Sequence, residues 1–200
     1  MIKAGYQIRN QSNPHFMTFT VVDWIDVFTR KQYRDILIDS MKFCQKQKGL
    51  ILHGYVIMSN HIHVIFQAET GNLSDLVRDF KVFTAKEILK AIEIGSESRS
   101  DWILKRFEFA AKSQSRNSKY QFWEYGNHPK EIFSETFFWT KLNYIHMNPV
   151  RANIVSKASE YMYSSASNYV YAKGLLDVTI APIPIIDFTK QNRIIEINEW

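Results

Sequence analysis

The sequence predicts an α+β fold whose elements follow the order strand, helix, strand, strand, helix, short strand, helix. Two observations carry this prediction: two long segments have apolar residues at helical spacing, and a pair of strand-like runs between them is separated by only two residues. A β-α-β-β-α-β order gives an antiparallel sheet with helices packed on one face. The opposite face is then expected to be open for a substrate.

The first strand is predicted at Phe16–Trp24, where the run FMTFTVVDW is rich in β-branched and aromatic residues. Thr29 offers an N-cap to the first helix. Gly49 is expected as the residue just after that helix, where a left-handed backbone conformation favours glycine. The apolar positions of the helix are Tyr33, Ile36, Leu37, Met41 and Cys44.

A hairpin and a second long helix are predicted next. Leu50–Met58 and His61–Ala68 read as strands, and asparagine in the two residues between them suits a tight turn. Asn72 is a good N-cap for a helix that reaches Gly95. Its apolar stripe consists of Leu73, Leu76, Val77, Phe80, Thr84, Ile88 and Ala91.

Three shorter elements complete the predicted order. A helix is expected near Trp102–Lys112 and a short strand at Lys119–Tyr125. Ser134 caps a final helix, which is predicted to end near Asn148 because Pro149 disfavours the α conformation in the residue before it.

Composition is that of a protein with a real core, since 46% of the 200 residues are hydrophobic and 14% are aromatic. The length fits one compact domain, and the single cysteine, Cys44, excludes an internal disulfide. No run resembles a signal peptide or reaches the roughly 20 apolar residues of a membrane span. We therefore expect a cytoplasmic, nucleoid-associated protein with no membrane partner.

The net charge of +5 is concentrated in one segment. Between Arg99 and Lys130 there are seven lysines and arginines against three carboxylates, which is most of the excess. Such a segment suits a polyanion such as nucleic acid, although a solvated helix face would have the same composition.

The sharpest chemical feature is His61-Ile62-His63 at the start of a predicted strand. Side chains alternate across a strand, so both imidazoles point to one face while Ile62 points to the other. Two imidazoles that converge on one point could hold a metal ion. The alternative is a pair of partly exposed surface histidines.

The final helix carries a second feature. Tyr144 and Asn148, four residues apart, share one shoulder of that helix with Lys141, beside the apolar stripe. Tyr144 could equally be a boundary aromatic and Asn148 a simple C-cap. Taken with the histidines, however, they form a set suited to phosphodiester cleavage: a tyrosine nucleophile and a divalent metal that polarises the phosphate. Imidazole and amide-oxygen ligands favour Mg²⁺ or Mn²⁺.

These residues lie in segments that resemble the HUH-type single-tyrosine transposases, in the branch of REP-associated tyrosine transposases. The run GYVIMSNHIHVIF resembles the histidine motif of that family, and NYIHMNPVRANIV resembles its catalytic helix. Further similarities are TFTVVDWIDVF, FKVFTAKEI, FWEYGNHPKEI and YSSASNY, so that the resemblance covers roughly residues 15–170. Ser59 departs from the family, where proline is frequent.

The resemblance implies a ferredoxin-like fold and metal-dependent cleavage and strand transfer of single-stranded or hairpin-forming DNA through a 5′-phosphotyrosine. It assigns Tyr144 as the nucleophile and His61, His63 and Asn148 as ligands of Mg²⁺ or Mn²⁺. It places the transposase domain at residues 1–178, with a basic insertion near 97–118, and leaves 179–200 as a C-terminal tail.

Several cations are predicted to contact the DNA backbone, and a homodimer is possible. Lys81 and Lys86 lie off the apolar stripe of the second long helix, where the alternative is a solvated face. The remaining candidates are Arg116, Lys119 and Arg151.

Two rival readings stay open. A cupin-like metalloprotein also uses His-x-His on a strand, but it would place a glutamate where this chain has Gln67 and Ala68. A domesticated relative that binds hairpin DNA without transposing would keep the same residues.

Overall fold

The computed structural model describes residues 7–113, 118–126, 128–181 and 200, and its centre is a four-stranded sheet. The strands lie in the order β2-β3-β1-β4, and every neighbouring pair is antiparallel. Their bounds are β1 His15–Thr20, β2 Leu50–Ile57, β3 His61–Ala68 and β4 Lys130–Glu131. The predicted α+β, ferredoxin-like fold class and the β2–β3 hairpin are confirmed.

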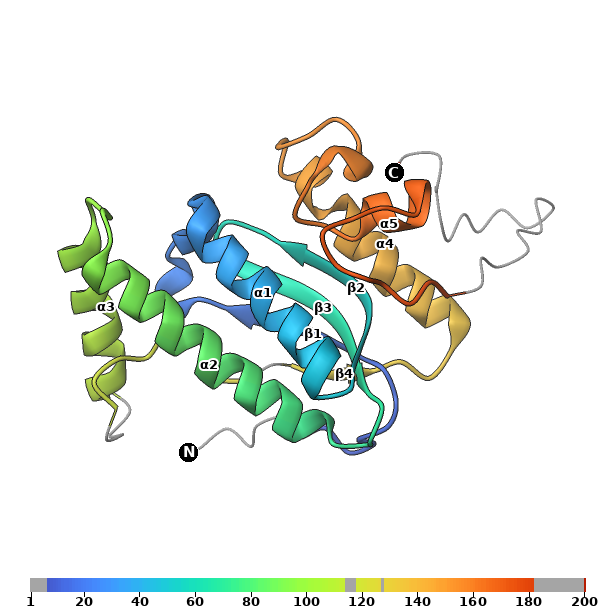
Figure 1. Ribbon diagram of the computed structural model, residues 1–200, viewed down its shortest axis with the longest axis horizontal. Helices are drawn as coiled ribbons and strands as arrows, with labels where there is room; N and C mark the ends of the chain where they lie inside the picture. Colours follow the sequence, from blue (N-terminus) through green and yellow to red (C-terminus); the bar gives the residue numbers. More distant parts are fainter. Residues whose placement is uncertain (1–6, 114–117, 127, 182–199) are drawn as a thin grey trace.

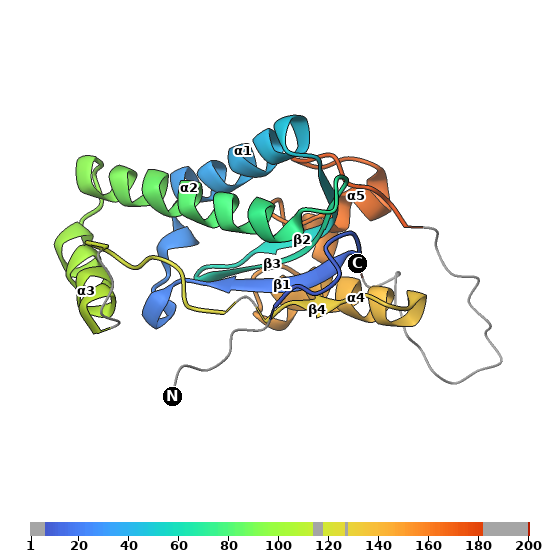
Figure 2. The same cartoon turned by 90° about the horizontal axis from the view of Figure 1, so that it is seen from below.

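Helices lie on both sides of this sheet (Figures 1 and 2). The two long helices α1 (Lys31–Gln47) and α2 (Leu73–Ile94) pack side by side on one face, as predicted. Helix α4 (Glu135–Arg151) lies on the other face, against β2 and β3. The face that was expected to be open for a substrate is therefore partly covered by α4.

Successive side chains of a strand point to opposite faces of the sheet, so the core has two parts, one under α1 and α2 and one under α4. Residues that face α1 and α2 include Met17, Phe19, Ile62, Val64 and Phe66. The smaller cluster under α4 contains Phe16, Val56, Ile65, Leu142 and Ile145. Because Ile65 has the same parity as His61 and His63, the two histidines also lie on the α4 side of the sheet, as their spacing predicted.

Shorter elements complete the fold. Helix α3 (Ser100–Ser113) lies beyond one end of the sheet, next to the end of α2 (Figure 1). Helix α5 (Ala166–Tyr171) lies beside α4 (Figure 1). The 3₁₀ turns are η1 (Val22–Trp24), η2 (Val27–Thr29) and η3 (Ala158–Glu160). None of the helices among the described residues is long and apolar enough to cross a lipid bilayer.

Two boundaries of the first half differ from the prediction. The first strand stops at Thr20 instead of Trp24, since the chain turns through η1 and η2 before α1. Thr29 belongs to η2, and the N-cap of α1 is Arg30. Asn72, Gly95 and the left-handed Gly49 lie where they were predicted at the helix ends.

The predicted strand at Lys119–Tyr125 is wrong. Only an isolated bridge joins Trp123 to Val21, and the regular strand β4 comes later in the chain. The aromatic residues that suggested a strand serve the core: Phe122 and Trp123 are buried against Phe28.

Helix α4 begins as predicted, because the Ser134 hydroxyl accepts a hydrogen bond from the Phe137 N–H. It does not end at Asn148 but runs through Pro149 to Arg151, and its C-cap is Ala152. Proline removes only one hydrogen bond of the helix, the one to the carbonyl four residues earlier. Asn148 is therefore an internal helix residue whose side chain is left for another role.

The docking of α4 depends on a glycine and on a buried histidine. A Cβ on Gly54 would lie 2.6 Å from Leu142 Cδ1, so only glycine lets the helix approach β2 this closely. His146 shares a 2.9 Å hydrogen bond with the Ser165 hydroxyl, which in turn accepts the Tyr55 N–H of β2. His146 therefore has a structural role in the docking of α4.

Candidate functional site

The candidate site lies where the start of β3 meets the middle of α4. His61 and His63 are neighbours on the same face, with ring centroids 4.7 Å apart. His63 Nδ1 shares a 2.8 Å hydrogen bond with the hydroxyl of Thr18, its cross-strand partner on β1. The Nε2 atom of His63 is buried and has no hydrogen-bond partner among the described residues.

The protonation of His61 follows from the hydrogen bonds around Asn60. The Asn60 amide nitrogen donates to the Trp24 carbonyl, so its oxygen is the atom that faces His61 Nδ1, at 2.7 Å. An amide oxygen only accepts, and the proton of neutral His61 must therefore be on Nδ1. Its Nε2 lone pair is left available, which is the arrangement that a metal-binding histidine requires.

Burial keeps both imidazoles neutral. It lowers the pKa of His61 to about 4, and burial together with the neighbouring His61 lowers the pKa of His63 to about 3. Neutral imidazoles can bind a metal without first losing a proton near pH 7. The same environment makes them poor proton donors.

Tyr144 reaches this pair from α4. Its ring lies edge to face with that of His63, at a centroid distance of 5.1 Å, and 39% of the residue is exposed. The Arg151 guanidinium lies 5.7 Å from the centroid of the Tyr144 ring, and the Lys141 ammonium lies over Phe16. Histidines and tyrosine from one chain are thus brought together, with two cations beside them.

Asn148 lies one helical turn beyond Tyr144 and is half-buried. Its side chain makes no hydrogen bond with any residue that the structure describes. Its amide oxygen is free to act as a ligand, and the C-cap alternative is excluded because the helix continues past it. Among the described residues, no group of three or more His, Cys, Asp and Glu could hold a metal ion, so a site here needs a ligand such as the Asn148 amide.

The predicted DNA-contacting cations are dispersed. Arg151 lies at the site, whereas Lys81 and Lys86 belong to α2, on the far side of the sheet. Lys81 donates to the Glu124 carbonyl, and burial lowers its pKa to about 8. Lys119 lies 3.6 Å from Glu93, away from the histidines, and Arg116 lies outside the described residues.

The basic segment is largely neutralised within the fold. Arg99 pairs with Asp26 and Glu97, and Lys112 pairs with Glu108. Arg106 binds Asp23 through both its Nε and its Nη2. Arg106 thus ties α3 to the turn after β1, and Arg99, just before α3, binds Asp26 in the next turn, so this charge is partly used within the fold.

Sequence reasoning missed three residues around the histidines. Thr18 and Asn60 orient the two imidazoles, and Trp24 lies edge to face with His61 at a centroid distance of 5.7 Å. The alternation of β1 could have pointed to Thr18. Nothing in the sequence indicates that the chain after β1 folds back so that Trp24 reaches His61.

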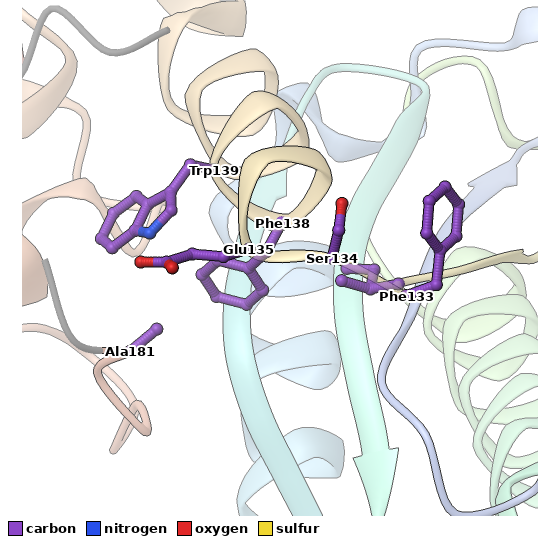
Figure 3. A pocket seen from close by; sticks show the side chains of 7 residues that line it. Phe133, Ser134, Glu135, Phe138, Trp139 and Ala181 are labelled. Atoms are coloured by element: carbon purple, nitrogen blue, oxygen red, sulfur yellow. The ribbon is translucent and has the colours of Figure 1, made fainter. Parts of the chain in front are cut away.

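Two hollows on the surface lie away from this site. Figure 3 shows one beside the start of α4, lined mainly by apolar residues, including Phe138, Trp139 and Ala181. A second hollow, between α2 and the chain before β1, includes Arg78 and Lys81. Neither contains the histidines or Tyr144.

Comparison with known proteins agrees with this geometry. The family model described as "Transposase IS200 like" matches residues 10–107, which include both histidines. Over these residues, the chain is similar to the IS200-like transposases. No curated protein sequence matches the chain.

A solved structure extends the likeness in fold beyond the family match. It is the structure of the REP-associated tyrosine transposase bound to a REP hairpin, and it is 16% identical, with a TM-score of 0.59. The likeness covers 92% of this chain and 94% of that one. The IS200-like part is thus continued by a segment of similar fold that contains α4 and Tyr144.

Proposed function

We propose that this protein is a transposase of the IS200-like family, which cuts and rejoins single-stranded DNA through a covalent bond to Tyr144. The observation that carries the proposal is the meeting of His61, His63 and Tyr144 in one chain, in ring contact. A partly exposed tyrosine beside two neutral imidazoles suits attack on a phosphodiester better than a structural role.

In the proposed step the Tyr144 oxygen forms a bond to phosphorus and the bond from phosphorus to the 3′-oxygen breaks. The tyrosine hydroxyl loses a proton, and the departing 3′-oxygen gains one. The products are a 5′-phosphotyrosine and a 3′-hydroxyl. That hydroxyl can later attack the linkage and reverse the exchange, so strand transfer needs no external energy source.

The residues fit a divalent cation such as Mg²⁺ or Mn²⁺. His61 and His63 would hold it through their Nε2 atoms, and Asn148 would add its amide oxygen. When bound, the cation neutralises charge on the scissile phosphate and makes the phosphorus more electrophilic. Asn60 and Thr18 hold the imidazoles in place, and Arg151 and Lys141 add positive charge beside Tyr144.

The proposed substrate is a DNA hairpin with a single-stranded flank. The solved structure of similar fold contains a REP hairpin, which supports this choice for the present chain. Homodimerisation stays a prediction.

The decisive experiment is incubation with Mn²⁺ or Mg²⁺ and labelled strands from DNA that flanks the gene, followed by denaturing electrophoresis. We expect a covalent protein–DNA band that needs the metal and disappears in Tyr144→Phe. Tyr125→Phe, which alters an equally exposed tyrosine, is the matched control and should retain the band. A band that survives in Tyr144→Phe would contradict the assignment of the nucleophile.

A second candidate function is binding of DNA hairpins without cleavage. The exposed Tyr144 ring, with the Arg151 guanidinium beside it, is compatible with such binding. Tight hairpin binding with no covalent band under any metal condition would favour this function over transposition.

A further inference from the structure

Trp24 is an exposed aromatic residue at the end of the turn η1. Its side chain does not contribute to the hydrophobic core. Its neighbours Val22 and Ile25 are buried, whereas 62% of Trp24 is exposed to solvent. Both Asp23 and Trp24 have positive φ angles, 54° and 55°, in the left-handed region that non-glycine residues rarely adopt. Strain of this kind persists only where the surroundings impose it, and it is concentrated at functional sites.

Three side chains from distant parts of the chain hold this turn. Arg106 on α3 binds the Asp23 carboxylate with two nitrogens, at 3.0 and 2.5 Å. The Glu124 carboxylate accepts the Asp23 N–H, and the Asn60 amide donates to the Trp24 carbonyl. The turn is thus fixed by α3 on one side and by the β2–β3 hairpin on the other.

The hydrogen bond from Asn60 couples the turn to the histidines. The same amide fixes the tautomer of His61, whose ring lies 5.7 Å from that of Trp24. The rings therefore form a continuous row, from Trp24 through His61 and His63 to Tyr144, with successive centroids 5.7, 4.7 and 5.1 Å apart. Trp24 and Tyr144 lie at the two ends of this row.

We propose that Trp24 stacks on an unpaired base of single-stranded DNA next to the scissile phosphate, and that Arg106 is a positioning residue for it. This inference rests on the proposed function, because it assumes a DNA strand that passes over the histidines. A phosphate at the histidines and Tyr144 places the neighbouring nucleotide within reach of the indole. Every base has a face that can stack on an aromatic ring, so such a contact holds a strand without reading its sequence.

The charge around the row favours nucleic acid over a second copy of this chain. Lys141 and Arg151, at the Tyr144 end, form no ion pair with any carboxylate that the structure describes. A positively charged surface with an exposed aromatic ring is the combination that single-stranded nucleic acid binds. The inference also gives the segment at 97–118 a function: α3 orients a DNA-binding turn and need not touch the DNA itself.

The test measures binding without cleavage, in the full chain carrying Tyr144→Phe. The probe is a labelled hairpin with a single-stranded extension from the flanking DNA, with 2-aminopurine placed at successive positions of the extension. We expect Trp24→Ala to weaken binding by about 5- to 150-fold, which is the range for loss of one base–aromatic stack. Quenching at one 2-aminopurine position should disappear in the same variant.

Two comparisons separate stacking from a general effect on folding. Trp24→Phe should retain most of the affinity. Trp102→Ala removes a different exposed tryptophan, on α3, and should bind like the parent protein. Arg106→Ala should lower the affinity and the local quenching, and Arg106→Lys should restore part of both. Equal binding by Trp24→Ala and Trp102→Ala would overturn the inference.

Further outcomes distinguish this inference from the proposed function. If Trp24→Ala binds normally while the chain with Tyr144 intact forms its covalent band, the stacking inference fails and the transposase proposal stands. If no covalent band forms but Trp24→Ala loses binding, the cleavage proposal fails and the stacking inference stands. If Trp24→Ala instead converts a dimer to a monomer in sedimentation, Trp24 belongs to a protein interface and the inference is overturned.

Discussion

Tyr144 and His63 lie edge to face with their ring centroids 5.1 Å apart, although one belongs to α4 and the other to β3. Their meeting depends entirely on how α4 docks on its own sheet. The contacts that fix this docking are therefore as important for the candidate site as the residues within it.

Gly54 sets how closely α4 approaches the sheet. Gly54→Ala should destabilise the fold by about 1–3 kcal/mol, because the new methyl group meets Leu142 Cδ1 and the packing must shift. Displacement of α4 should also weaken the covalent band. Chemical denaturation of Gly54→Ala, Leu142→Ala and the double variant measures the coupling. Purely additive effects would contradict the close contact.

The N-cap of α4 is a smaller contribution to the same docking. Ser134→Ala should lower the free energy of unfolding by about 1 kcal/mol, because the Phe137 N–H loses its acceptor. Thr136→Ala, in the same exposed first turn, removes no such bond and should have a much smaller effect. Ser134→Asp should retain the stability, and a loss as large as that of the alanine variant would argue against capping.

His146 makes the stability depend on pH. Burial lowers its pKa to about 3 in the folded protein, against an ordinary value of 6.5. Between these two pH values the unfolded chain binds a proton at His146 and the folded chain does not. The contribution of neutral His146 to the free energy of unfolding is therefore fully present above pH 6.5 and is lost as the pH falls. The loss from this group should be about 2 kcal/mol between pH 7 and pH 5.

His146→Phe removes this titration while His61 and His63 stay in place. Urea denaturation at pH 7 and pH 5 should therefore give a smaller loss of stability for the variant than for the parent protein. An identical loss in both would mean that His146 keeps its ordinary pKa in the folded state.

Metal binding can be tested without DNA. Mn²⁺ should raise the melting temperature of the parent protein, since a ligand at a hundred times its Kd stabilises the folded state by about 2.7 kcal/mol. His63→Gln should lose this shift, and Asn148→Ala should reduce it. His53→Gln alters another histidine of the sheet, which is hydrogen-bonded to Gln67, and should retain the shift in melting temperature. A full shift in Asn148→Ala would remove Asn148 from the ligand set.

The central part of the fold could be predicted because its local signals agree with its packing. The hairpin, the Asn72 and Ser134 caps and the face shared by His61 and His63 all follow from period-2 or helical spacing. At Phe122 and Trp123 the aromatic residues that favoured a strand are buried beside α3, and burial alone does not require a ladder of backbone hydrogen bonds. At Pro149 the packing of α4 overrides the local preference that predicted a helix end.

Most residues of the candidate site could also be predicted from the sequence, but the residues that hold them in place could not. His61, His63 and Tyr144 were found by spacing and resemblance, and the structure brings them together. Thr18, Asn60 and Trp24 support them from separate segments, through contacts that no local periodicity encodes. The same is true of the ion pairs that neutralise the basic segment, since Asp23 and Asp26 precede it by many residues.

The segment after α4 also pairs with the outer edge of β2. Ser164 bridges to Val56, the Ile57 N–H donates to the Tyr163 carbonyl, and the Ser165 N–H donates to the Tyr55 carbonyl. An uncovered edge strand would invite pairing with another chain and, through it, aggregation. The run YSSASNY thus shields this protein from edge-to-edge association at β2, and the two-residue β4 borders the sheet on its other side.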